Sequence, residues 1–299
     1  MKKFIAVLLI SNFHYTSFAQ QLPLSSFYEM QGVLNNPATA GLQHHGVIGT
    51  TFRSQWSSIP GSPKTAVLFG SAFLQKAHLG LGGYVYNDVT GPIKNTGLQM
   101  AYAYQVPLSN EATFSLGIEG RFQQFSMDKQ KLQESLGAND PVLSGDAKKI
   151  KGDAGFGMVY TDKKLLIGLS VSQLVQSRLN LYSGSTPGNE KAKFYRHYYL
   201  QAQFNWQVDD AVKIIPNLLA VYLPNAPTEL QGGIRVEHQQ LFWYGLSLRK
   251  DQGWLFSAGI NVKQMFRIGY SFDLYNTPSS IYDKGSNGQE IMLAYHFIH

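Results

Sequence analysis

The chain has 299 residues, no cysteine and a formal net charge of +6, and only 15 % of its residues are charged. Disulfides, thiolate-bound metals and cysteine nucleophiles are therefore excluded, and so small and scattered a charge does not favour nucleic acid as a partner. The charged fraction lies well below the ~25 % of ordinary soluble domains, whereas 18 Phe, 17 Tyr and 29 Gly are present. This composition is typical of an outer-membrane β-barrel.

Residues 1–19 have the organisation of a cleavable secretory signal. Two lysines precede an apolar run over residues 4–10, and a Ser-Phe-Ala sequence suited to signal peptidase ends at Ala19. The apolar run is too short to cross a hydrocarbon core of ~30 Å. We therefore predict Sec-dependent export with cleavage near Ala19.

From residue 46 onward, apolar residues alternate with polar or small ones at a period of two. The stretch 198–208 places Tyr, Leu, Ala, Phe, Trp and Val on one face and mainly Gln and Asn on the other. Segments of about ten residues with this pattern are expected when one face of a strand meets lipid and the other a polar lumen. About fourteen antiparallel strands are predicted, at 46–56, 65–74, 78–88, 96–107, 112–126, 152–161, 165–176, 195–208, 212–223, 228–238, 241–250, 253–263, 266–275 and 288–298.

The connections between these strands fall into two alternating sets. One set is tight, with two to four residues at each turn, and the other is mostly long and rich in Gly, Ser, Asn and Pro. The long set covers 57–64, 89–95, 127–151, 177–194 and 276–287. Short periplasmic turns and long extracellular loops are the rule in outer-membrane barrels. The sequence thus predicts an all-β transmembrane barrel, a single domain over residues 46–299, with an interruption at Pro216 because proline lacks a ladder donor.

Catalytic and metal-binding chemistry is not favoured. His44 and His45 are adjacent, so on a strand they would point to opposite faces, and the aspartates of loop 127–151 lack the regular spacing of a calcium loop. The histidines fall on different strands, and no spacing singles out a serine or carboxylate partner. We expect neither enzyme activity nor a cofactor or metal.

The first long connection has a distinct composition. Trp56 ends the first strand, where an indole would suit the membrane–water interface. Ile59, Pro60 and Gly61 then favour a turn, and Pro63 stiffens the return into the second strand. Two interpretations remain open, an ordered hairpin loop and a rigid docking surface.

Five motifs, read together, resemble the PorP/SprF family of type IX secretion system outer-membrane proteins. They are NNPATAG (35–41), QWSSIPGSPKT (55–65), GLGGYVYNDVTGP with Asp88 and Gly91 (80–92), residues 139–174 and residues 269–297. The resemblance implies a fourteen-stranded barrel that helps deliver or anchor secreted proteins, such as large adhesins, at the cell surface in secretion and gliding. The implied partners are a secreted protein with a type IX C-terminal targeting domain, other type IX components and outer-membrane lipid.

The Asn-Pro-Ala element also resembles FadL-like barrels, in which the N-terminal segment folds inside the barrel. We therefore expect residues 20–45 to form a lumen plug. Leu34, Ala38 and Ala40 would pack on the inner wall, and Asn35 and Asn36 would satisfy polar backbone there. Pro37 and Gly41 complete this candidate element.

The last strand places Leu293, Tyr295 and Phe297 on one face, as expected of a C-terminal signal for barrel assembly. Because the predicted lumen faces contain more Gln, Gly and Ser than Arg or Asp, an open, charge-lined channel is disfavoured. A porin or a FadL-like transporter is nevertheless kept as the alternative function.

Overall fold

The computed structural model describes residues 25–136, 147–177, 194–224, 226–276, 284 and 287–297. Its strands are β1 (Gly46–Gln55), β2 (Lys64–Leu74), β3 (Leu79–Thr90), β4 (Ile93–Pro107), β5 (Thr113–Met127), β6 (Ala147–Thr161), β7 (Leu165–Ser172), β8 (His197–Phe204), β9 (Trp206–Gln207), β10 (Val212–Tyr222), β11 (Glu229–His238), β12 (Phe242–Arg249), β13 (Gly253–Val262), β14 (Phe266–Tyr275) and β15 (Gly288–Phe297). Short 3₁₀ helices are η1 (Gly32–Leu34), η2 (Pro37–Thr39) and η3 (Gln75–Ala77), and α1 covers Lys129–Leu136.

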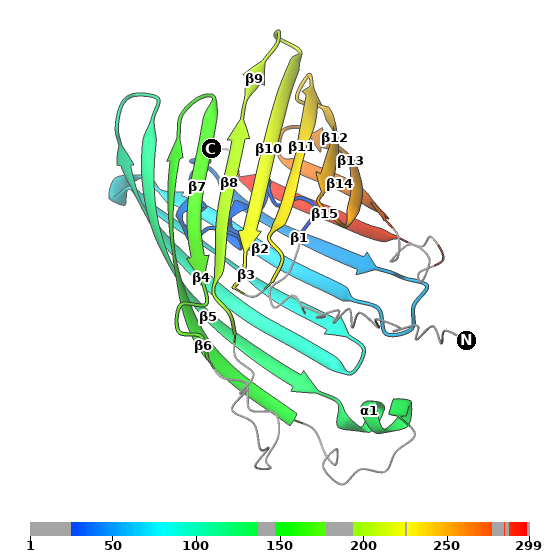
Figure 1. The fold of residues 1–299 in the computed structure, drawn as a ribbon. Coiled ribbons are helices and arrows are strands. Elements are labelled where there is room, and N and C mark those ends of the chain that lie inside the picture. Colours follow the sequence, from blue (N-terminus) through cyan, green and yellow to red (C-terminus); the bar gives the residue numbers. More distant parts are fainter. Residues whose placement is uncertain are drawn as a thin grey trace, which may run out of the picture.

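These strands close into one antiparallel barrel (Figure 1). Each strand pairs with the next along the chain, except that β8 and β9 both pair with β10. The last strand, β15, pairs back with β1 in a register that joins Gly46 to Phe297 and Gln55 to Gly288. Since β8 and β9 are two parts of one interrupted strand, the described chain forms a closed barrel of fourteen strands, as predicted. Closure leaves no sheet edge of the kind that invites aggregation.

The alternation of side chains along each strand is the reason for this fold. On β5, Ile118 and Phe122 point outward and are 61 % and 62 % exposed, whereas Glu119 and Arg121 point inward and are buried. Large apolar side chains cover the outside of the barrel, where a hydrocarbon phase would solvate them. No helix in the described ranges has the length and apolar character needed to cross a membrane.

The interruption expected at Pro216 is present on one side of its strand. Pro216 keeps its register with Ile234 of β11. On the other side β10 pairs with β9 up to Ile214 and with β8 from Asn217 onward, and Asn205 lies between these two pieces. The missing proline N–H therefore coincides with a break in only one ladder.

Three predicted boundaries are wrong, and one of them is the start of β6, which is predicted at residue 152 but lies at Ala147. Residues 89–95 were expected to form a long loop, but β3 and β4 extend to Thr90 and Ile93 and leave only a two-residue turn. The strand expected to reach residue 176 ends at Ser172. Of the remaining long connections, loop 127–151 contains α1, and most of 177–194 and 276–287 lies outside the described residues.

The short turns are ordered by local hydrogen bonds. In the turn between β6 and β7, the N–H groups of Leu165 and Lys164 each donate to Asp162 Oδ1 at 2.8 Å. These two donors hold the pKa of the Asp162 carboxyl below its usual range. Such compact turns fix the register of neighbouring strands at this end, which we call the short-turn end.

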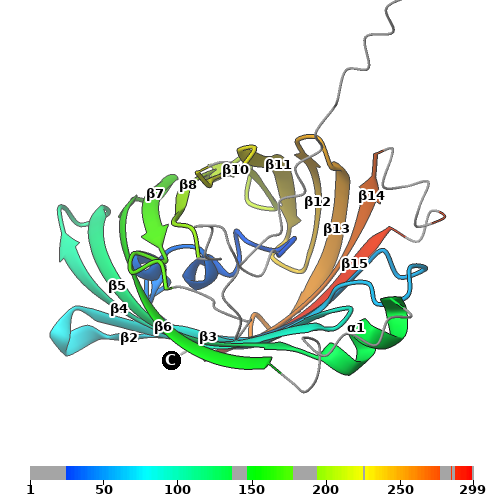
Figure 2. The ribbon, with the colours of Figure 1, turned by 60° about the horizontal axis from the view of Figure 1, so that its bottom comes forward.

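The segment before β1 lies inside the barrel (Figure 2). It contributes to each of three buried clusters: Val33, Leu34 and Ala40 pack with β2–β4, Tyr28 with Tyr199 and Leu219, and Phe27 with Trp243 and Met292. The hydrophobic core of this barrel is therefore built between its wall and residues 25–45, which we call the inner segment.

Candidate functional site

Asn36 fixes the inner segment to one wall of the barrel. Its side-chain oxygen accepts the N–H of Ala38 at 3.0 Å and so caps η2, which begins with Pro37. Its side-chain nitrogen donates to the carbonyls of Met158 and Leu169, both at 3.2 Å. One buried amide therefore orders the segment and binds two neighbouring strands.

Glycines in the wall allow this close approach. A Cβ built on Gly117 would lie 2.3 Å from the nitrogen of Ala38, and one on Gly157 would lie 2.0 Å from the side-chain oxygen of Asn36. On Gly80 a Cβ would lie 1.9 Å from the carbonyl oxygen of Ala40. No larger residue fits at these positions, so backbone packs directly against backbone. We call this surface the glycine wall.

Polar side chains of the same wall satisfy the carbonyls of the segment. Ser170 donates to the carbonyl of Asn35 at 2.5 Å, Ser115 to that of Ala38 at 2.7 Å and Gln105 to that of Ala40 at 3.1 Å. Asn35, predicted to act through its side chain, thus contacts the wall through its backbone. Gly41 adopts a φ of +70° where the chain passes Gly80, a conformation that glycine adopts without strain.

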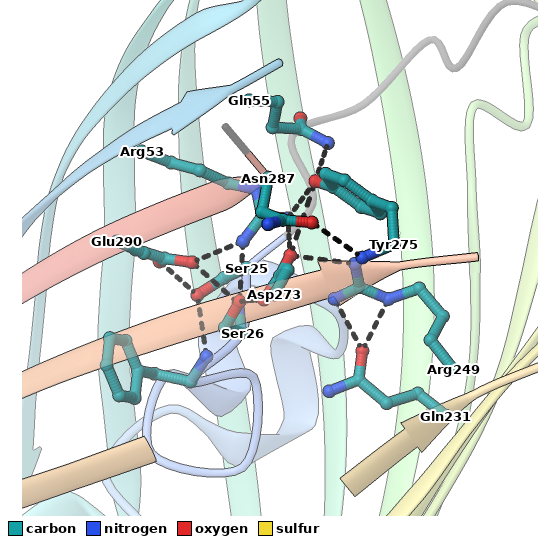
Figure 3. Close-up of polar contacts among 11 residues, drawn as sticks. Ser25, Ser26, Arg53, Gln55, Gln231, Arg249, Asp273, Tyr275, Asn287 and Glu290 are labelled. Atoms are coloured by element: carbon teal, nitrogen blue, oxygen red, sulfur yellow. Dashed lines mark hydrogen bonds and ion pairs between the residues drawn. The ribbon is translucent and has the colours of Figure 1, made fainter. Parts of the chain in front are cut away.

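The opposite wall holds the start of the inner segment through buried charges (Figure 3). Ser25 Oγ and the N–H of Ser26 donate to the two carboxylate oxygens of Glu290, each at 2.7 Å. Arg53 donates to Ser26 Oγ at 2.5 Å and pairs with Glu290 at 3.1 Å and with Asp273. These contacts join β1, β14 and β15 at the place where the barrel closes.

This cluster extends across the neighbouring strands. Arg249 of β12 lies 3.3 Å from Asp273 and donates to Gln231 of β11 at 2.9 and 3.0 Å. Two arginines are therefore set against the two carboxylates of Asp273 and Glu290, and all four side chains are buried. Buried charges are tolerated only when paired and hydrogen-bonded in this way. We call Arg53, Arg249, Asp273 and Glu290 the charge quartet.

The lumen contains more ion pairs than the sequence suggested. Arg235 binds Glu29 of the inner segment at 2.8 Å and also pairs with Glu237. Arg121 pairs with Glu119 at 2.9 Å, and both are buried. The prediction of a lumen with mainly Gln, Gly and Ser therefore omitted these buried ion pairs. Sequence period places these residues inward but cannot say which of them meet across the barrel.

The outer rim differs from the prediction at Trp56. Its ring lies 5.8 Å from that of Tyr275, centroid to centroid, and its N–H group on the indole is buried. Tyr275 belongs to the lumen, where its hydroxyl accepts from Gln55 at 3.1 Å. The backbone N–H of Trp56 donates to the carbonyl of Asn287 at 2.8 Å. Trp56 therefore joins two outer connections instead of facing lipid.

The other predicted rim residues lie together. Ile59 and Ser62 close successive turns, and Pro63 accepts the N–H of Gln55 at 3.0 Å. Gly61, with a φ of +77°, accepts the N–H of Gly91 from the next outer turn at 2.7 Å. Three outer connections are thus tied into one surface, the outer platform, which consists of residues 56–63, Gly91 and Asn287.

Two further predicted positions flank these sites. Asp88 on β3 accepts the hydroxyl of Thr65 on β2 at 2.5 Å. Pro60, between Ile59 and Gly61, is exposed on the outer platform.

The last strand presents its predicted residues on the outside. Leu293 and Phe297 are exposed, and Tyr295 packs between Phe266 and Phe297, with ring centroids 4.8 Å from each. This row belongs to the strand that closes the barrel against β1. Its role in assembly stays a prediction.

At the short-turn end, His45 Nε2 lies 3.0 Å from His296 Nδ1, whereas His44 packs on Phe73. Within the ranges that the structure describes, no group of three His, Asp or Glu side chains is arranged to hold a metal ion.

Sequence reasoning missed the charge quartet and the purpose of the wall glycines. Gly80 belongs to the 80–92 motif, and in the barrel it faces the backbone of Ala40. The available signal was the combination of inward-facing glycines with a small-residue segment before the first strand.

Comparison with known proteins agrees with this architecture. Residues 17–295 match the model of a family described as type IX secretion system membrane protein PorP/SprF. The toluene transporter TodX of Pseudomonas putida superposes with a TM-score of 0.50 at 9 % identity, covering 90 % of this chain and 94 % of that one. The outer-membrane protein Omp33 of Acinetobacter baumannii has a TM-score of 0.48 at 8 % identity, covering 86 % and 98 %. No curated protein sequence matches the chain. At such identities the TodX superposition reports the barrel fold alone.

Proposed function

The chain belongs to the PorP/SprF family of type IX secretion system membrane proteins, and from this premise we propose that it is a plugged, non-enzymatic outer-membrane barrel that helps deliver or anchor secreted proteins at the cell surface. The clients would be proteins such as large adhesins with a type IX C-terminal targeting domain. The barrel would reach the outer membrane after Sec export and cleavage near Ala19 of the leader, residues 1–19, which lie outside the described residues. Other type IX components and outer-membrane lipid would be its remaining partners.

The observation that carries this proposal is the filled lumen. The inner segment packs against the glycine wall on one side of the barrel and is bound by the charge quartet on the opposite side. Ala38 and Ala40 are completely buried against the barrel. A barrel filled in this way is suited to present a surface rather than to conduct solutes.

The outer platform is the proposed contact surface for a client. Hydrogen bonds between residues 56–63, Gly91 and Asn287 make it rigid, so little conformational entropy would be lost on binding. Ser57 and Pro60 are exposed on it. Replacing Pro60 with Arg should weaken client retention without disturbing the barrel, whereas Lys76→Glu at the opposite end should leave retention unchanged.

The direct test is deletion of the gene, followed by proteomics of the cell surface and the culture medium. Loss of one or a few large secreted proteins from the surface, with solute permeability unchanged, would support anchoring or delivery and would name the clients. An unaltered surface proteome would contradict it.

The alternative function is transport through the barrel, as a porin or a FadL-like transporter. The observation in its favour is a small cavity of about 100 Å³ between the inner segment and the wall, where Val33, Leu42 and Phe69 provide apolar surface. A fall in small-solute uptake on gene deletion, with the surface proteome unaltered, would support this alternative.

A further inference from the structure

A second, larger cavity opens at the short-turn end, which the barrel rule places in the periplasm. Its volume is about 460 Å³, within the range of ligand sites. The turns after β9, β11 and β13 contribute to its rim, and Gln43 and His45 of the inner segment form its inner end. The cavity lies at the end of the barrel opposite the outer platform.

Several polar groups that line this cavity lack partners among the described residues. Lys213 forms no ion pair or hydrogen bond there, although it stands directly across from Glu237 in the β10–β11 register. Nε2 of His296 is buried without a hydrogen-bond partner. The side chain of Gln43 is exposed and forms no hydrogen bond to a described residue. Of these groups only Nε2 of His296 is buried, and a buried polar group is costly to leave unpaired.

Arg267 is held in place at the same cavity. Its Nε donates to Asn261 Oδ1 at 2.8 Å, and Asn261 in turn donates to the carbonyl of Gln240 at 3.1 Å. The Nη2 atom lies 3.8 Å from Glu237, beyond hydrogen-bond distance. The guanidinium of Arg267 is therefore held in one orientation, and its Nη2 atom forms no hydrogen bond to Glu237.

The charges of this region favour one anionic group. Two basic side chains, Lys213 and Arg267, and two acidic ones, Glu237 and Asp210, line the cavity, and Glu237 already pairs with Arg235 behind the lining. Asp210 is exposed at the tip of the β9–β10 turn, where water screens it. One carboxylate between Lys213 and Arg267 would give both basic groups an anionic partner at hydrogen-bond distance.

We propose that this cavity binds a carboxylate carried on an extended peptide segment that enters from the periplasm. Lys213 and Arg267 pair with the carboxylate, and Gln43 and His296 provide hydrogen bonds to the peptide backbone. The mixture of donors and acceptors suits amide groups, and the cavity volume suits about three residues. This site is independent of client binding at the outer platform.

The test uses the mature chain in lipid nanodiscs. Because the chain contains no cysteine, Ala211→Cys at the cavity rim can carry a single trifluoromethyl label for ¹⁹F NMR. The probes are acetyl-Gly-Glu-Gly-amide, its Gln counterpart and sodium acetate. We expect a saturable shift with the Glu peptide, and Kd values at least about ten-fold weaker for the Gln peptide and for acetate, the loss expected for a charge-assisted hydrogen bond.

Lys213→Gln and Arg267→Gln should each weaken the Glu peptide about ten-fold. Lys76→Gln, a matched lysine in a short turn outside the cavity, should change nothing. The Lys213 side chain forms no hydrogen bond or ion pair with the described residues, so its variant stays informative if Arg267→Gln reduces folding. Equal affinity for the Glu and Gln peptides, equal affinity for acetate, no saturable shift, or insensitivity to Lys213→Gln would each overturn the proposal.

Discussion

The two walls that hold the inner segment do so by different means. On the glycine wall, contact is a matter of shape: backbone meets backbone because glycines leave no side chain between them. On the wall formed by β1, β14 and β15, contact is electrostatic, and Ser25 and Ser26 complete a cluster of buried charges. The difference teaches that one segment can be fixed by steric fit on one side and by charge pairing on the other. Each wall should therefore fail under a different kind of substitution.

The largest effect is expected when both contacts are removed together. Deleting residues 20–41 behind an intact leader would take away the segment that fills the lumen, and a barrel of this size then encloses a polar passage. Planar-bilayer recordings should show a clear rise in single-channel conductance over the full-length protein. An unchanged conductance would contradict the plug.

The charged wall should be sensitive to loss of a single charge. Arg53→Gln leaves Asp273 and Glu290 with only Arg249 to balance them, which should cost about 4 kcal/mol of stability. Urea unfolding in lipid vesicles measures this. The double variant with Glu290→Gln restores charge balance, so its cost should be smaller than the sum of the two single costs. Additive costs would show that the quartet does not act as a unit.

The glycine wall should be sensitive to volume instead. Gly117→Val would drive a side chain into the backbone of Ala38, and we expect a loss of about 3 kcal/mol, the upper part of the range for overpacking. Gly120→Val is the matched control, because a Cβ at this position on the same strand meets nothing within 4 Å. Similar losses in both variants would mean that strand propensity, not the inner segment, decides the outcome.

The smallest expected effect is the difference in stability between alanine substitutions of the two neighbouring asparagines. Asn36→Ala removes the cap of η2 and two hydrogen bonds to strand carbonyls, and should cost about 2 kcal/mol. Asn35→Ala should cost less than about 0.5 kcal/mol, because Asn35 contacts the wall through its carbonyl. Equal losses from the two substitutions would refute the assigned role of the Asn36 side chain.

The barrel was predictable from sequence because its main signal is local. Alternation along ten residues identifies a strand, and the lengths of successive connections identify the two ends. Strand boundaries were wrong where local composition was misleading. The Gly, Pro and Asn of residues 89–95 suggested a loop, although five of these seven residues pair in β3 and β4.

The site was only partly predictable because its contacts are not local. The Asn-Pro-Ala element drew attention to residues 35–41, but nothing near Arg53 in the sequence points to Asp273 or Glu290. Those partners become neighbours only when β1 meets β15. Trp56 was misplaced for the same reason, since its neighbour Tyr275 comes from the other end of the chain.

The meeting of Ser25 with Glu290 also has a consequence for biogenesis. These residues are separated by 265 positions, and Arg53 and Glu290 face each other in the register that closes the barrel. A chain whose synthesis or insertion stops before the last strand would leave Arg53 without Glu290, and Ser25 and Ser26 without the carboxylate that binds them. The quartet thus acts as a checkpoint for completeness, because Ser25 and Ser26 are secured only when Glu290 of the last strand is in place.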